Sequence, residues 1–180
     1  MVSSGIPSVP KLSVDSSGDS PGRGAAYGLS PAEVRALDTA FHLAQKAGQN
    51  GDVPVGAVVL TPEGIAAGLG LNQRECPPYD PSAHAEIVAL REAAGRMERW
   101  NLQGCTLVVT LEPCTMCAGA IVNARISRLI FGAWDAKAGA CGSVRDVVRD
   151  SRLNHQVEVK GGVDELRAKA LLREFFGERR

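Results

Sequence analysis

The chain has 180 residues and no net formal charge, with 20 Lys and Arg against 20 Asp and Glu. Hydrophobic residues make up 44% and charged residues 22%, which excludes a disordered or fibrous chain. The zero net charge argues against a general polyanion binder, because such proteins usually carry a basic surplus. At about 150 residues per domain, the length predicts one domain with a short extension.

The sequence carries neither of the two common membrane signals. No apolar run approaches the roughly 18 residues that a membrane span requires. The first residues, Met1 to Gly5, lack the basic and apolar regions of a secretory signal. We therefore expect a cytoplasmic protein with no membrane partner.

Residues 1–28 differ in composition from the rest of the chain. They are rich in Ser, Gly and Pro and show no hydrophobic period, so they cannot repay the entropy lost on ordering. The sequence predicts a disordered tail there and a folded domain over residues 29–180. The domain begins at Ser30-Pro31-Ala32-Glu33, a capping box with proline at the first helical position.

Strand-like and helix-like patterns alternate through the domain. We predict helices over residues 31–48, 83–97, 114–124, 143–148 and 163–176, and strands over residues 55–60, 65–71, 106–111, 129–133 and 156–160. Such alternation predicts a layered α/β fold with helices on both faces of a sheet.

Five cysteines are present, and Cys114 and Cys117 form a C-x-x-C pair at the start of a predicted helix. Residues three apart share a helical face, and the positive end of the helix dipole lowers a thiol pKa. Two thiolates suit Zn²⁺ but provide only half of a tetrahedral shell. Cys76, Cys105 and Cys141 have no comparable spacing, so we expect free thiols.

The segment His84-Ala85-Glu86 supplies the missing chemistry. A neutral imidazole is a good zinc ligand, so His84 is the candidate third ligand beside Cys114 and Cys117. Three protein ligands leave one position open, which is typical of a catalytic zinc. Glu86, two residues further on, can lean over that open position as a general acid and base. The residues thus predict one catalytic zinc ion per subunit.

Two other functions fit part of this pattern. A strand followed by C-x-x-C at a helix start also describes a thioredoxin-like redox site, but that hypothesis leaves His84 and Glu86 unexplained. A non-catalytic RNA-binding subunit stabilised by zinc would have no use for the carboxylate of Glu86.

H-x-E followed by P-C-x-x-C is the signature of zinc-dependent nucleobase deaminases. Across residues 30–180, the chain resembles the bacterial tRNA-specific adenosine deaminases of the cytidine and deoxycytidylate deaminase superfamily. The segments that carry the resemblance are residues 53–58 (VPVGAV), 80–87 (DPSAHAEI), 110–120 (TLEPCTMCAGA), 131–133 (FGA), 135–137 (DAK), 154–155 (NH) and 175–176 (FF).

The resemblance implies a three-layer α/β/α cytidine-deaminase-like fold, with a central five-stranded mixed sheet, in a homodimer. It implies hydrolysis of adenosine to inosine at the wobble position of a tRNA anticodon, with arginine tRNA as the expected substrate. It implies no organic cofactor. A free nucleobase or nucleoside deaminase acting on guanine or cytosine is the alternative, because it would use the same zinc site.

The resemblance also assigns residues to the RNA. Asn72 would orient the extruded nucleoside, and the backbone around Ala85 would contact its base. Asp135 would approach a ribose 2′-hydroxyl, the group that distinguishes RNA from DNA. Lys137 would contact a phosphate, and Phe175 would belong to the RNA-contacting end of the last helix.

Trp134 departs from the family pattern, since this position is often basic. Its side chain is either a packing residue or a surface on which an anticodon base stacks.

Overall fold

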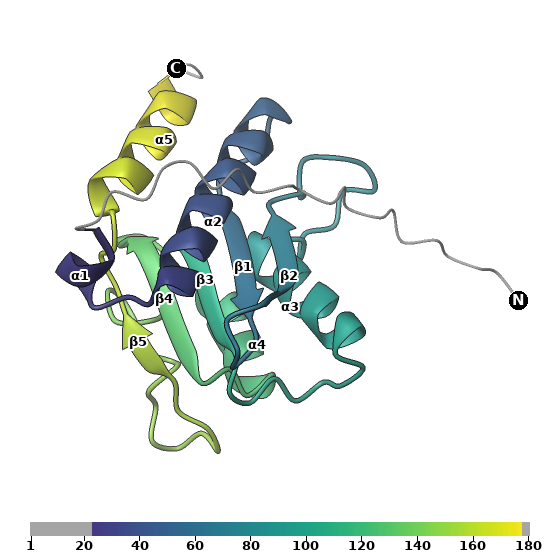
Figure 1. Ribbon diagram of the computed structural model, residues 1–180. Helices are drawn as coiled ribbons and strands as arrows, with labels where there is room; N and C mark the ends of the chain where they lie inside the picture. Colours follow the sequence, from purple (N-terminus) through teal and green to yellow (C-terminus); the bar gives the residue numbers. More distant parts are fainter. Residues whose placement is uncertain (1–22, 178–180) are drawn as a thin grey trace, which may run out of the picture.

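A five-stranded mixed sheet forms the centre of the protein (Figure 1). The computed structural model describes residues 23–177, and its strands lie in the order β2-β1-β3-β4-β5. β1 is antiparallel to β2 and β3, whereas β3, β4 and β5 run parallel. The strands are β1 (Gly56–Leu60), β2 (Ala66–Leu71), β3 (Thr106–Leu111), β4 (Arg128–Ala133) and β5 (Glu158–Lys160).

Helices cover both faces of this sheet (Figure 1). On the central strands, Val58, Val108 and Ile130 pack in one buried cluster with residues of α2 and α5. Val59 and Val109, which point the opposite way, pack with residues of α3 and α4. The expected three-layer α/β/α fold is confirmed. The helices are α1 (Arg23–Tyr27), α2 (Pro31–Gln49), α3 (Ala85–Arg96), α4 (Thr115–Asn123) and α5 (Glu165–Gly177).

The capping box predicted at the start of the domain is present. Ser30 Oγ accepts from the Glu33 backbone N–H, and the Glu33 carboxylate accepts from the Ser30 N–H at 2.7 Å. The disordered tail was predicted over residues 1–28; residues 1–22 lie outside the described part, and residues 23–27 form α1. Within residues 23–177, no helix is both long and apolar enough to cross a bilayer.

The helix predicted over residues 143–148 is wrong. The segment is irregular, and its backbone pairs with the preceding loop: Val147 N–H donates to Ala140, and Gly142 N–H donates to Arg145. Asp146, in the middle of the segment, pairs with Cys141 in an isolated antiparallel bridge. Partners outside the segment therefore replace the i to i−4 bonds that its apolar spacing suggested.

Two glycines of β2 allow α3 to lie directly on the sheet. A Cβ on Gly70 would lie 2.0 Å from the Ala85 carbonyl oxygen, and one on Gly68 would lie 2.1 Å from that of Ala89. Because backbone atoms fill this space, no side-chain rearrangement can make room. The absence of a side chain at residue 70 therefore lets the first turn of α3, which follows His84, pack directly on β2.

Gly70→Ala is expected to lower the free energy of unfolding by about 1–3 kcal/mol, as overpacking does in a closed core. Gly95→Ala in α3 is the matched control, because nothing lies within 4 Å of its added Cβ. That control should stabilise the protein by up to about 1 kcal/mol through helix propensity. Urea denaturation measures both; equal effects of the two variants would contradict the close-approach argument.

Candidate metal centre

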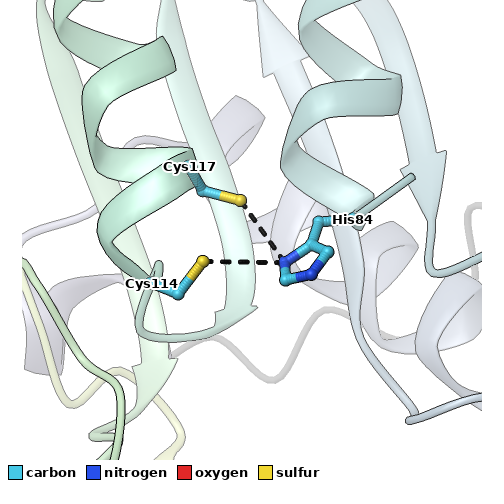
Figure 2. Close-up of side chains that lie close together, drawn as sticks. All are labelled: His84, Cys114 and Cys117. Atoms are coloured by element: carbon cyan, nitrogen blue, oxygen red, sulfur yellow. Dashed lines mark hydrogen bonds between the residues drawn. The ribbon is translucent and has the colours of Figure 1, made fainter. Parts of the chain in front are cut away.

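The N-termini of α3 and α4 meet at the carboxyl ends of β2 and β3 and bring three ligand side chains together (Figure 2). His84 is the N-cap of α3, and Cys114 is the N-cap of α4, which follows the carboxyl end of β3. Cys117, one turn into α4, is buried and points to the same place. The predicted ligand set is therefore assembled from segments 30 residues apart in the chain.

The distances fit a tetrahedral metal ion. His84 Nδ1 lies 3.7 Å from Cys114 Sγ and 3.5 Å from Cys117 Sγ, and the three ligand atoms lie within 4.8 Å of one another. Zn–N bonds of about 2.0–2.1 Å and Zn–S bonds of about 2.3 Å at a tetrahedral angle require N···S separations of about 3.6 Å. Three soft-to-borderline donors at this spacing suit Zn²⁺.

The electrostatics of the pair favour one thiolate before any metal binds. Hydrogen bonds from Cys117 and His84 lower the pKa of Cys114 to about 3, against the opposing effect of burial. The same contact with Cys114, together with burial, raises the pKa of Cys117 above its usual range. A metal ion that binds both sulfurs must therefore release the proton of Cys117.

Glu86 lies in the first turn of α3 and is only 4% exposed. Burial raises the pKa of its carboxyl, although its own backbone N–H and the charge of His84 act in the opposite direction. A buried carboxyl whose proton is held more tightly can both accept and return a proton near neutral pH. This is the chemistry expected of a general acid and base.

Asn72 and Ala85 also meet at this site. The Asn72 side-chain oxygen accepts a hydrogen bond of 3.0 Å from the Ala85 backbone N–H, one of the unpaired donors at the start of α3. Asn72 is 5% exposed and directly follows β2. The two residues assigned to the nucleoside thus lie together beside His84.

Sequence reasoning gave no role to Glu112, which the structure places between β3 and the metal-binding cysteines. Its buried carboxylate accepts 2.9 Å and 3.0 Å hydrogen bonds from the backbone N–H groups of Asp135 and Cys141, and another of 3.0 Å from Ser143. The loop after β4 is thereby fixed against the start of α4. The only signal in the sequence was its position, an acidic residue between a predicted strand and P-C-x-x-C.

The loop that Glu112 holds carries two of the predicted RNA contacts. The half-buried Asp135 carboxylate accepts from the Lys137 backbone N–H at 2.9 Å, and the Lys137 side chain is exposed. Phe175 lies elsewhere: it is 9% exposed, packs edge to face on Phe176, and lines a cavity of about 400 Å³ between α2 and α5. The structure does not bring Phe175 among the metal ligands.

Comparisons with known proteins agree with this geometry. Residues 31–133 match the model of the cytidine and deoxycytidylate deaminase zinc-binding region. The tRNA-specific adenosine deaminase of Haemophilus influenzae is 47% identical over 78% of this chain and 81% of its own length. A solved chain from studies of A-to-I editing by tRNA:A34 deaminases at the wobble position of transfer RNA has a TM-score of 0.74 at 37% identity, covering 77% of this chain and 99% of that one.

A longer protein also contains a similar segment. The tRNA(Ile)-lysidine synthase of Deinococcus radiodurans is 49% identical over 79% of this chain, but the matched part is only 24% of that protein. The chain therefore spans about a quarter of the length of that relative. Together with the ligand geometry, these similarities show that the chain contains a zinc-binding deaminase region and that its cofactor is Zn²⁺.

Cys117→Ser is expected to remove zinc and lower the thermal stability, because metal binding stabilises the folded site. Cys76→Ser is the matched control, since Cys76 is a half-buried cysteine outside the ligand set. Elemental analysis should find one zinc per chain in the unmodified protein and the control, and almost none in Cys117→Ser. Full zinc content in Cys117→Ser would contradict the assignment.

Glu112→Gln is expected to keep zinc but to loosen the loop after β4. An amide offers one acceptor oxygen, and its own N–H donors face the backbone donors. The free energy of unfolding should therefore fall by about 1–3 kcal/mol. Glu75→Gln, at a 58% exposed side chain, serves as the control. Hydrogen exchange at residues 135–143 should rise in Glu112→Gln alone; unchanged exchange would show that the carboxylate does not hold the loop.

Proposed function

Because this chain belongs to the cytidine and deoxycytidylate deaminase family and, within it, to the tRNA-specific adenosine deaminases, we propose that it hydrolyses adenosine to inosine at the wobble position of a tRNA anticodon. Ammonia is the second product. The observation that carries the proposal is the arrangement of His84, Cys114 and Cys117 around one point, with the buried Glu86 two residues from the histidine. A redox C-x-x-C pair would not need either His84 or Glu86.

Each polar group of the site has a task in this reaction. His84, Cys114 and Cys117 would hold Zn²⁺, which would supply a Lewis acid that lowers the pKa of a water to near neutral. Glu86 accepts a proton from the attacking water and delivers it to the ring nitrogen of adenine. The water oxygen bonds to C6 of adenine, and its remaining proton passes through Glu86 to the exocyclic amine. The C6–N bond then breaks and ammonia leaves, so the carboxylate ends in its starting state.

The residues around this centre are suited to hold an extruded nucleoside. Asn72 and the Ala85 backbone lie at the start of α3, next to the ligand His84. Asp135 and Lys137 lie on the loop fixed by Glu112, where they would meet ribose and phosphate. A nucleotide in a single-stranded loop costs less to extrude than one in a duplex, which favours an anticodon loop as substrate.

The remaining assignments follow from membership of the family. We propose that residues 29–180 act as the deaminase domain, in a cytoplasmic homodimer that needs no organic cofactor. Phe175, near the end of α5, belongs to the proposed RNA surface rather than to the metal centre. Arginine tRNA is the proposed substrate.

The test uses the zinc-loaded full chain and the anticodon stem-loop of an arginine tRNA with adenosine at the wobble position. Inosine should appear at that position alone, read by reverse transcription and sequencing. Free guanine and cytidine, offered without RNA, should release no ammonia. Absence of inosine would overturn the proposal, and ammonia from a free base would favour the free-nucleobase deaminase.

Glu86→Gln is expected to retain zinc and RNA binding while inosine formation falls by about 10²–10⁴-fold, the usual contribution of a positioned general acid and base. Glu98→Gln, at an exposed position just after α3, should edit at the normal rate. Single-turnover rates and zinc content are measured on the same preparations. Normal editing by Glu86→Gln would remove this residue from the mechanism.

A further inference from the structure

Trp134 lies at the carboxyl end of β4, on the same side of the sheet as the metal centre at the end of β3. It directly follows β4, whose last residue, Ala133, pairs with Leu111 at the end of β3. The metal-binding segment continues from that end of β3, and Glu112 binds the backbone N–H of Asp135, the residue after Trp134. Ligands of α/β sheets bind outside the carboxyl ends of the strands, which is where this indole lies.

The indole is held rigidly although it is exposed. The Phe131 ring packs against it edge on, with ring centroids 4.7 Å apart and an interplanar angle of 90°. A Cβ at Gly161 would lie 2.7 Å from its Cζ2 atom, and one at Gly142 would lie 3.2 Å from its Cζ3 atom. Glycines on two loops thus leave a slot for the ring, yet Trp134 remains 39% exposed.

Cationic residues lie on the loops that surround the indole. Lys137 and Arg145 are exposed, and neither has an ion-pair partner within residues 23–177. The Arg145 backbone carbonyl accepts a hydrogen bond from the Gly142 N–H, which places residue 145 on the loop that borders the indole. The guanidinium closest to Gly142 is that of Arg149, which is paired with Asp146. Exposed aromatic rings beside free cations suit a single nucleic-acid strand, because the bases stack while the phosphates meet the charges. Protein interfaces, in contrast, have few charges at their centre.

We propose that the open part of the Trp134 ring is a stacking platform for an unpaired RNA base next to the target adenosine. The proposal rests on the proposed function and deepens it, because it assigns a contact for a base that is not itself deaminated. A rigid ring loses little entropy on binding, so stacking fixes the loop while Asp135 and Lys137 engage its backbone. Trp134 is thus a binding residue and takes no part in proton transfer.

The two tryptophans of the chain allow a direct test by fluorescence. Trp100→Phe leaves Trp134 as the sole emitter, and Trp134→Phe leaves Trp100, which is 67% exposed and lies beyond the far end of α3. Each protein is titrated with an anticodon stem-loop that carries inosine at the wobble position and is not turned over. Trp134 emission should be quenched in step with RNA binding, measured separately by anisotropy, while Trp100 emission stays constant.

Kinetics give a second, independent readout. Trp134→Leu should raise KM for the stem-loop by about 5- to 150-fold, which corresponds to the about 1–3 kcal/mol that stacking of one base contributes, with a smaller effect on kcat. Trp134→Phe, which keeps an aromatic face, should restore most of the affinity. Trp100→Leu should leave KM unchanged.

The outcomes separate this proposal from the proposed function. Constant Trp134 emission at saturating RNA, with inosine formation intact, would show that Trp134 only packs, and would overturn the stacking contact alone. Absence of RNA binding would overturn both proposals. Emission that changes with protein concentration and not with RNA would show that a second copy of the chain covers Trp134, which also overturns the stacking contact.

Discussion

The metal centre depends on the N-termini of α3 and α4 meeting at the carboxyl ends of β2 and β3. α3 reaches this point because Gly68 and Gly70 let it lie against the backbone of β2, and α4 reaches it from the end of β3. The positive end of each helix dipole then faces the two cysteine sulfurs, which favours the negative charge that they carry once a metal ion binds. A shift of either helix by one residue would separate His84 from the cysteines.

Buried carboxylates hold the loops on both sides of this centre. Glu112 binds the backbone of the loop after β4, and Asp52, which is fully buried, accepts from the N–H groups of Val53 and Glu75 at 2.7 Å and 2.9 Å. Backbone donors satisfy both charges, so the cost of burial is offset by charge-assisted hydrogen bonds. These hydrogen bonds therefore hold the loops on both sides of the metal centre from the protein interior.

The zero net charge of the chain does not describe how its charges are distributed around the site. Residues 29–100 carry 6 basic and 9 acidic groups, and residues 101–180 carry 12 and 9. Several arginines of the second part are engaged in ion pairs, as Arg149 is with Asp146 and Arg152 with Asp150. Local cations such as Lys137 and Arg145, rather than an overall basic surplus, are what the proposed RNA surface offers.

Local patterns determined much of this protein. The capping box at Ser30 and the alternation of strands and helices depend on near neighbours, and the structure confirms both. The C-x-x-C spacing also acts within one helical turn, and it places the sulfurs of Cys114 and Cys117 within 4.8 Å of each other. Tertiary structure decided what depends on distant partners. Residues 143–148 pair with the preceding loop and do not form the predicted helix. Glu112 accepts hydrogen bonds from three backbone N–H groups 23 to 31 residues away. The Trp134 ring packs between two loops that are distant from each other in the sequence. Sequence spacing describes contacts within a helical turn, whereas contacts between segments exist only after the chain has folded.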